Sequence, residues 1–250
     1  MWPSHVINLA RNTRRMEASA RQLDAAAVPW SRIDAVWGAD LSEAEVARVY
    51  DAARNARDGK HALVAPEIGC YLSHIAAWRA IAEGDAPGGF IFEDDFAADE
   101  TLAGKLALLS EPQDMWDMVK LFSFDPAPRL VAEAPLGDWR IAIPYRVPTC
   151  LIGYGVTKAA AKRLADRAIP FFRPVDEDQK FVWETGLRVG LVLPPPIVVG
   201  DQDAATGTIG AVRRATRSGR GTLGQGLHNL RYQARYGWRL WRHRRAEGRT

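Results

Sequence analysis

Three consecutive acids, Glu93, Asp94 and Asp95, follow the short apolar run Phe90–Phe92. Carboxylates held at the end of a buried strand can bind a hard divalent cation, and that cation can neutralise the phosphates of a nucleotide substrate. Open α/β sheets bind their ligands at the carboxyl ends of the strands. The triplet therefore predicts a metal and phosphate site, with a solvated acidic strand end as the alternative.

A second group of polar residues lies within the mostly apolar segment 66–81, which predicts a largely buried helix. Glu67 and His74 point to the same side of such a helix, and burying them costs free energy unless they are paired. Both are candidate site residues, and a hydrogen-bonded core histidine is the alternative for His74. Gly69 permits a close approach by a neighbouring segment or by a ligand.

A third group, Asp176, Glu177 and Asp178, follows Pro174 and Val175. The proline predicts a helix start there, where backbone amide dipoles favour carboxylates. A carboxylate in this place can act as a general base, and a plain helix terminus is the alternative.

The elements that must position these acids alternate between strands and helices, which predicts an α/β sheet. Ser42 and Glu45 form a capping-box pattern, and Thr157 is a helix cap. We expect strands at 6–9, 32–36, 90–92, 116–122, 140–143, 149–156 and 189–193, with glycines and a proline at 84–89 breaking the chain. We expect helices from about 15 to 27, from 42 to 57, from 66 onward, and at 102–109, 158–168 and 176–186.

The composition is that of a globular protein with a sizeable core, since 47% of the 250 residues are hydrophobic and 25% are charged. The first residues carry no leader pattern and no apolar run is long enough to span a bilayer, so we expect a cytoplasmic protein. Cys70 and Cys150 have apolar neighbours and no metal-binding spacing, which predicts buried free thiols.

The last forty residues differ in charge from the rest of the chain. Residues 211–250 hold eleven arginines and one acid, Glu247, a net +10, which leaves −7 for residues 1–210 of a chain that carries +3. The sequence thus predicts a catalytic domain, 1–210, and an arginine-rich amphipathic tail, 211–250.

Apolar residues recur through the tail at helical spacing: Leu227, Leu230, Ala234, Trp238 and Trp241. A basic amphipathic helix of this kind can lie on an anionic membrane surface, and packing on the domain is the alternative. Nucleic-acid binding is not expected, because the body of the protein is acidic.

Four segments in this order resemble glycosyltransferase family 25, which includes bacterial lipooligosaccharide galactosyltransferases and the collagen galactosyltransferases. They are residues 6–9 with Arg14 and Arg15, residues 67–74, residues 90–95, and residues 174–178. The resemblance spans about residues 5–205, and the shared order and spacing make it more specific than any single motif.

The resemblance implies a nucleotide-diphospho-sugar transferase fold of the A type, a Rossmann-like mixed sheet flanked by helices. It also implies an inverting transfer of a hexose, commonly galactose, from a UDP-sugar with Mn²⁺ or Mg²⁺. The acceptor is then a surface glycan or lipid-linked glycan. If the tail binds a membrane instead of packing on the domain, it would hold the protein on the cytoplasmic face of the inner membrane.

The resemblance also implies roles for individual residues. Asp94 and Asp95 would hold the metal, and Asp176, or else Asp178, would be the catalytic base. The donor-binding residues would be Asn8, Leu9, Arg11, Arg14, Arg15, Glu67, His74 and Glu93. Asp201 or Asp203 could approach the metal, although a polar loop is favoured there.

Two other classes of function use the same features. A metal-dependent phosphohydrolase could employ the same acids with water as the attacking group. A non-catalytic protein could bind membranes or nucleic acid through its basic tail.

Overall fold

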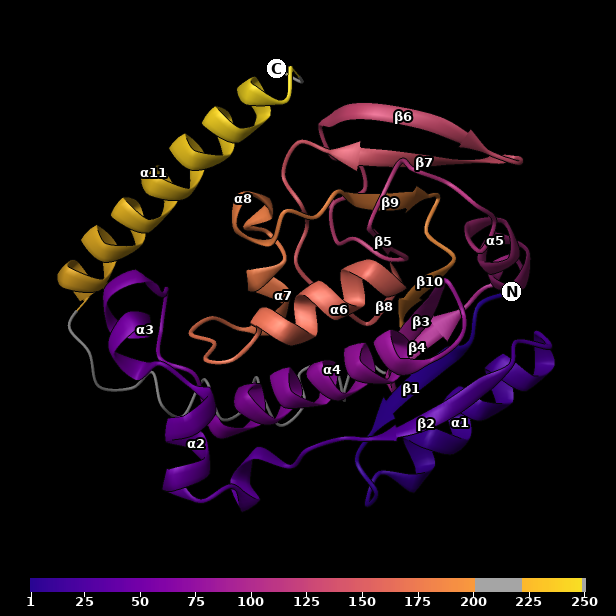
Figure 1. Cartoon of the computed structure of the whole chain (residues 1–250), viewed down its shortest axis with the longest axis horizontal. Helices are drawn as coiled ribbons and strands as arrows, with labels where there is room; N and C mark the ends of the chain where they lie inside the picture. Colours follow the sequence, from indigo (N-terminus) through magenta and orange to yellow (C-terminus); the bar gives the residue numbers. More distant parts are fainter. Residues whose placement is uncertain (201–221, 249–250) are drawn as a thin grey trace.

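A mixed eight-stranded sheet forms the centre of the protein in a computed structural model that describes residues 1–200 and 222–248 (Figure 1). Its strand order is β2-β1-β3-β8-β5-β9-β7-β6. The strands are β1 (Ser4–Asn8), β2 (Trp30–Asp34), β3 (Gly88–Glu93), β5 (Met118–Lys120), β6 (Leu130–Leu136), β7 (Trp139–Pro144), β8 (Gly153–Thr157) and β9 (Val189–Leu193). A small antiparallel pair, β4 (Phe96–Ala98) and β10 (Ile197–Val199), lies beside it.

Helices cover both faces of the sheet. They are α1 (Thr13–Ala25), α2 (Glu43–Val49), α3 (Ala52–Asp58), α4 (Ala65–Glu83), α5 (Leu102–Leu109), α6 (Lys158–Arg167), α7 (Val175–Asp178), α8 (Val182–Thr185) and α11 (Thr222–Ala246), with a short 3-10 turn, η1 (Gly38–Asp40). Figure 1 shows α4 and α6 side by side across one face, and they contact each other along their length. This arrangement confirms the predicted α/β class and is consistent with the A-type fold.

Alternate side chains of the strands lie in two hydrophobic clusters on opposite faces of the sheet, because successive side chains of a strand point to opposite faces. Ile7 and Ile91 pack toward α4 and α6, whereas Val6, Phe90 and Phe92 pack toward α1 and α5. The central strands are apolar on both faces because both faces are covered. The carboxyl ends of the parallel strands β1 and β3 therefore emerge together from a rigid core.

Most of the predicted elements are present, with differences that tertiary contacts explain. The capping box at Ser42 and the cap at Thr157 are confirmed. The helix predicted from 42 to 57 is wrong as one element: it divides into α2 and α3, because the chain between them bonds to Phe171. The helix predicted over 176–186 likewise divides into α7 and α8.

The glycines of segment 84–89 do not all break the chain. Gly88 and Gly89 are the first residues of β3. Glycine is needed at position 88 because the ring of Trp2 occupies the space where a side chain would lie. Strands β4, β6 and β10 were missed by the sequence analysis. β6 is a half-exposed edge strand that contains Pro135, a pattern common at sheet edges.

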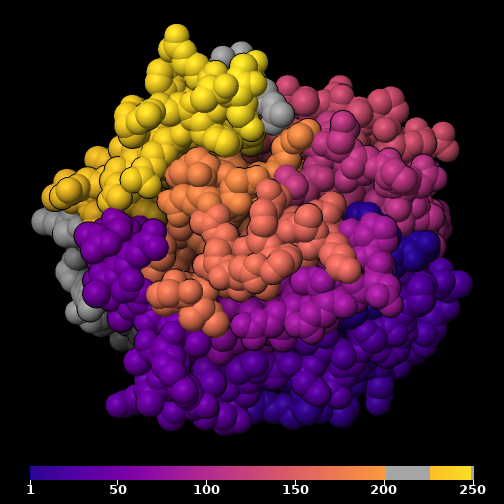
Figure 2. Space-filling model, in the orientation of Figure 1, coloured from indigo at the N-terminus to yellow at the C-terminus, as the bar shows by residue number. Residues whose placement is uncertain are grey.

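The last described helix, α11, lies against the body of the protein (Figure 2). Tyr232, Tyr236 and Leu240 are buried on its inner side. The guanidinium of Arg244 donates to the carbonyl oxygens of Tyr145 (3.1 Å) and Pro144 (2.8 Å). Packing on the domain was the alternative expectation for this segment, and one stripe of the helix does pack.

Leu227, Leu230, Trp238 and Trp241 of α11 remain exposed. The helix therefore carries two apolar stripes, of which one is buried on the body and the other faces outward. Of the helices in residues 1–200 and 222–248, none combines the length and apolar composition needed to cross a bilayer.

Candidate active site

The ends of β1 and β3 bring Asn8 against the acidic triplet. Asn8 is buried, and its side-chain amide donates to Asp94 Oδ2 (2.5 Å). Arg15, in the first turns of α1, reaches back with its guanidinium to Asp94 Oδ1 (3.1 Å) and Asp95 Oδ2 (2.9 Å). Both oxygens of Asp94 are thus engaged by protein groups.

Asp95 is in a different situation. Its Oδ1 atom is buried and has no hydrogen-bond partner within the described residues. Burial and the negative charge of Glu93 raise the pKa of Asp95 to about 6, against the opposing effect of Arg15. A buried carboxylate oxygen that lacks a donor is suited to a bound cation. Of the two aspartates, Asp95 is therefore the better candidate for a metal ligand. The Asp94 carboxylate instead binds Asn8 and Arg15.

A pocket of about 360 Å³ joins the separate sequence motifs. Its lining includes four acids, Glu67, Glu93, Asp95 and Asp176. They come from α4, from the end of β3 and from α7, segments that are far apart in the sequence. The volume lies in the range of small-ligand sites, and the convergence of carboxylates makes this the candidate active site. We call it the acidic pocket.

Asp176 faces this pocket from α7. Its Oδ2 atom accepts the backbone N–H of Cys150 (3.2 Å), in a turn where Cys150 has φ +79°. Left-handed backbone is uncommon for a side chain of this size, and it concentrates at functional sites. The turn thus fixes the position of Asp176.

The other predicted base, Asp178, faces a different direction. It accepts the hydroxyl of Tyr71 (2.7 Å) and forms an ion pair with Arg173 (2.9 Å), and it is absent from the pocket lining. Of the two residues, the structure brings only Asp176 into the acidic pocket.

Lys120 supports the same turn and was missed by the sequence analysis. It is buried at the end of β5 and donates to the carbonyl oxygens of Pro148 (2.5 Å) and Cys150 (2.8 Å). Burial lowers the pKa of Lys120 to about 8, partly offset by Asp176. The sequence offered one indication that Lys120 supports a site, which was its position as the lone lysine of the predicted apolar strand 116–122.

His74 acts inside the protein rather than on its surface. It is fully buried, and its Nδ1 atom lies 2.8 Å from the Tyr154 hydroxyl, which accepts the indole N–H of Trp78 (2.8 Å). Since the indole can only donate, the tyrosine hydrogen is available to Nδ1, and this network assigns the proton of His74 to Nε2. Nε2 lies 3.2 Å from Glu93 Oε1. His74 therefore orients Glu93 and has no exposed surface for a ligand.

Cys70 lies in the wall of the acidic pocket one helical turn before His74. Cys70, His74 and Glu93 offer ligand atoms that all lie within 4.8 Å of one another. Sulfur and imidazole suit a softer ion such as Zn²⁺, whereas carboxylates alone suit Mg²⁺ or Mn²⁺. Burial raises the pKa of the Cys70 thiol well above its usual value, and it raises that of Cys150 to about 12. Both cysteines are free and only partly exposed.

Glu67 lines the acidic pocket and also closes the start of α4, where it accepts the backbone N–H of Val64 (2.9 Å). The close approach permitted by Gly69 is to a neighbouring segment, since a side chain at 69 would meet the Val36 carbonyl oxygen at 2.4 Å. A ligand is not needed to explain this glycine.

The remaining predicted donor-binding residues lie at the beginning of the chain. Leu9 directly follows β1 and is partly exposed. Arg11 stacks on the ring of Trp37 at 3.3 Å, and Arg14 is exposed on α1. None of these three lines the acidic pocket. Asp201 and Asp203 lie outside the described residues.

Comparison with known proteins gives the family. Residues 1–126, half of the chain, match the model of glycosyltransferase family 25, described as an LPS biosynthesis protein family. The chain belongs to glycosyltransferase family 25. The match contains β1, α4 and the acidic triplet, and it ends before the segment that carries Asp176.

Two curated relatives illustrate the range of the family. The chain is 26% identical to Procollagen galactosyltransferase 1-A of Xenopus laevis over 185 residues, which are 69% of this chain and 29% of the relative. It is also 26% identical to Inactive glycosyltransferase 25 family member 3 of Homo sapiens over 189 residues, 69% of this chain and 30% of the relative. The chain thus spans less than a third of the length of these relatives, of which one is named as a galactosyltransferase and the other as inactive.

Proposed function

We propose that this protein is an active, metal-dependent glycosyltransferase that moves a hexose, galactose first among the candidates, from a UDP-sugar to a glycan acceptor. The observation that carries the proposal is the acidic pocket, where Asp95 and Asp176 share one cavity at the carboxyl ends of β1 and β3. Membership of family 25 supports transferase chemistry over the phosphohydrolase alternative.

In this proposal Asp95 and Glu93 hold the divalent cation, Mn²⁺ or Mg²⁺. The orphaned Oδ1 atom of Asp95 and the carboxylate-rich lining fit such an ion. When bound, the ion supplies charge that stabilises the diphosphate as it leaves. Asp94 holds Asn8 and Arg15 in place, and Asn8, Leu9 and the arginines of α1 form the nucleotide side of the site.

Asp176 is the proposed general base for an inverting transfer. The acceptor hydroxyl oxygen forms a bond to the anomeric carbon while the bond from that carbon to the diphosphate oxygen breaks, and the hydroxyl proton passes to Asp176. The Cys150 turn and Lys120 keep the Asp176 carboxylate in place for this step. Glu67 and Glu93 are the other two acids that line the pocket around the donor, and His74 orients Glu93.

The second apolar stripe of α11 supports association with an anionic bilayer surface, which suits a lipid-linked acceptor. Leu227, Leu230, Trp238 and Trp241 are exposed on a helix that also carries exposed arginines. Tryptophan and leucine can enter the headgroup region while arginine attracts anionic lipid. Replacing Trp238 and Trp241 with serine should abolish co-sedimentation with phosphatidylglycerol vesicles. Unchanged binding would contradict the membrane proposal alone.

The decisive test of the enzyme proposal measures donor binding and transfer together. UDP-galactose should raise the melting temperature in the presence of Mn²⁺ and less so without it, because a ligand of the native state stabilises that state. Zn²⁺ should not replace Mn²⁺ if Asp95 and Glu93, rather than Cys70 and His74, hold the ion. Asp95→Asn should abolish both the Mn²⁺-dependent shift and sugar transfer.

The proposal fails if no UDP-sugar binds or reacts with Mn²⁺ present. A faster release of phosphate from a simple phosphomonoester than of sugar from any UDP-sugar would instead favour the phosphohydrolase.

A further inference from the structure

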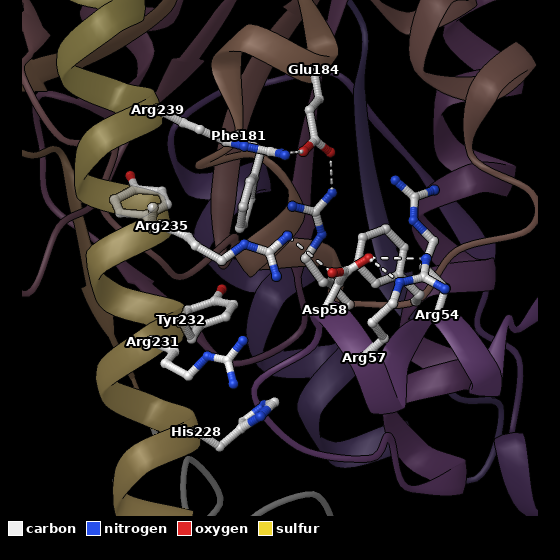
Figure 3. Close-up of a pocket in the computed structure, with 13 residues that line it drawn as sticks. Arg54, Arg57, Asp58, Phe181, Glu184, His228, Arg231, Tyr232, Arg235 and Arg239 are labelled. Carbon is white, nitrogen blue, oxygen red and sulfur yellow. Dashed lines mark hydrogen bonds and ion pairs between the residues drawn. The ribbon is translucent and has the colours of Figure 1, made fainter.

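A second cavity, of about 570 Å³, lies between α3, α8 and α11 (Figure 3). Arginine dominates its lining. The six arginines are Arg54, Arg57, Arg173, Arg231, Arg235 and Arg239, and the acids of the lining are Asp58 and Glu184. We call this cavity the arginine groove. Its helices come from both halves of the chain, so the groove exists only in the folded protein.

The two acids hold several of these arginines in place without matching their charge. Asp58 pairs with Arg57 (3.1 Å) on its own helix and with Arg235 (3.0 Å) across the groove. Glu184 pairs with Arg173 and with Arg239 (3.4 Å). Arg173 also pairs with Asp178 (2.9 Å), which lies outside the lining. Six guanidinium groups therefore meet three carboxylates among the described residues, a formal excess of three positive charges.

Arg173 gives the strongest sign of a missing ligand. Only 3% of its side chain is exposed, and its Nε atom has no hydrogen-bond partner among the described residues. The guanidinium is stacked on Phe181 at 3.5 Å, which fixes its plane. A buried, rigid guanidinium with an unused N–H is costly unless an acceptor binds there.

Arg54 and Arg231 add charge that no acid of the described chain compensates. The Arg54 guanidinium lies on the ring of Phe172 at 4.0 Å. Figure 3 shows Arg231 pointing from α11 toward α3, with no interaction drawn to another residue of the groove. The ion pairs of Arg235 with Asp58 and of Arg239 with Glu184 already join α11 to the other two walls of the groove. The groove is thus built before any ligand arrives.

We propose that the arginine groove binds a phosphate group. Phosphate carries up to two negative charges and several acceptor oxygens, which matches several convergent guanidinium forks better than a single carboxylate would. The phosphate can belong to a lipid headgroup, since α11 also bears the exposed tryptophans, or to a soluble phosphorylated compound. This site does not depend on transferase activity.

Neighbouring residues of one segment line the groove and the acidic pocket. Arg173 lines the groove, and Asp176, three residues later, lines the acidic pocket. A phosphorylated molecule held in the groove would therefore lie next to the segment that positions the proposed base.

The test uses the whole chain without divalent metal, so that the acidic pocket does not contribute to phosphate binding. A double variant, Arg54→Gln with Arg231→Gln, removes two charges that form no ion pair with any residue the structure describes. The matched control, Arg21→Gln with Arg79→Gln, removes two charges from exposed arginines of α1 and α4 that lie outside the groove. Exposed substitutions of this kind should fold normally, and circular dichroism checks this. The single variant Arg231→Gln serves if the double variant does not fold.

Two probes distinguish the sources of phosphate. Inorganic phosphate is titrated by calorimetry, and phosphatidylcholine vesicles with and without phosphatidic acid are tested by co-sedimentation. The groove variant should weaken binding of at least one phosphate probe by about tenfold or more, and the control by less than about twofold. Binding of both probes or of inorganic phosphate alone indicates a soluble ligand site, and binding of phosphatidic acid vesicles alone indicates a headgroup site. The proposal is overturned if the wild type binds neither probe, or if the control loses as much affinity as the groove variant.

Discussion

The arginine groove is lined in part by residues 172–173 and the acidic pocket by residues 174–176, and the two cavities are built in opposite ways. Strand ends and a tight turn form the acidic pocket, whereas helices from distant parts of the chain form the groove. In the pocket carboxylates outnumber cations, and in the groove guanidinium groups outnumber carboxylates. Each cavity therefore holds charge that the protein itself does not neutralise.

This difference indicates where stability is given up for binding. Burial and the charge of Glu93 raise the pKa of Asp95 to about 6. The buried Nε–H of Arg173 has no acceptor within residues 1–200 and 222–248. Such unsatisfied groups are rare in protein interiors, and each of these two lies beside a cavity lined with charge of its own sign. We expect the pocket to accept a cation with its substrate, and the groove to accept an anion.

The largest effect should come from the wall of the acidic pocket. Asp176→Asn keeps an oxygen for the Cys150 N–H but removes the proton acceptor, so kcat for sugar transfer should fall by about 10²–10⁴-fold with little change in the KM for the donor. Steady-state transfer assays measure both constants. Asp166→Asn, which changes an exposed aspartate of α6, is the control. Equal kcat values for Asp176→Asn and wild type would remove Asp176 from the mechanism.

The second prediction tests whether the wall of the arginine groove belongs to the folded body. Leu240 is 1% exposed and Leu230 is 67% exposed on the same helix. Leu240→Ala should lower the free energy of unfolding by about 2–4 kcal/mol, because it removes buried apolar surface and leaves a cavity. Leu230→Ala should change it by less than about 0.5 kcal/mol. Urea denaturation measures both values, and similar results for the two variants would mean that α11 does not pack on the domain.

The smallest effect concerns the charge of Asp95. The pKa of Asp95 in the folded protein, about 6, lies above the ordinary value of 3.8. The stability that protonated Asp95 contributes is therefore fully present below pH 3.8 and is lost as the pH rises through 6. In metal-free protein, Asp95→Asn should therefore be more stable relative to wild type at pH 8 than at pH 5, by about 1–2 kcal/mol. Urea denaturation at the two pH values is the measurement. If the difference in unfolding free energy between the two proteins does not vary with pH, then the charge of Asp95 does not destabilise the fold.

Local pattern was sufficient for much of the framework. The apolar run 90–92 predicted a buried strand, the Ser42 and Thr157 caps predicted helix starts, and helical spacing predicted α11, because each signal depends on residues within one or two turns. The sequence missed β4 and β10, which are only three residues long, and it placed one helix where the pairing of Tyr50 with Phe171 produces two. A contact across more than a hundred residues leaves no local pattern.

By itself, the sequence determined the α/β class, the family resemblance and the acids from which the candidate site is built. Only the tertiary structure decided how those acids differ. Asn8 and Arg15 bind both oxygens of Asp94, whereas Asp95 Oδ1 has no partner in the described part of the chain. Asp176 lines the pocket, and Asp178 instead contacts Tyr71 and Arg173. Neighbours in the chain have nearly the same local sequence, so only the packing of distant segments around each side chain can give them different partners, exposure and charge.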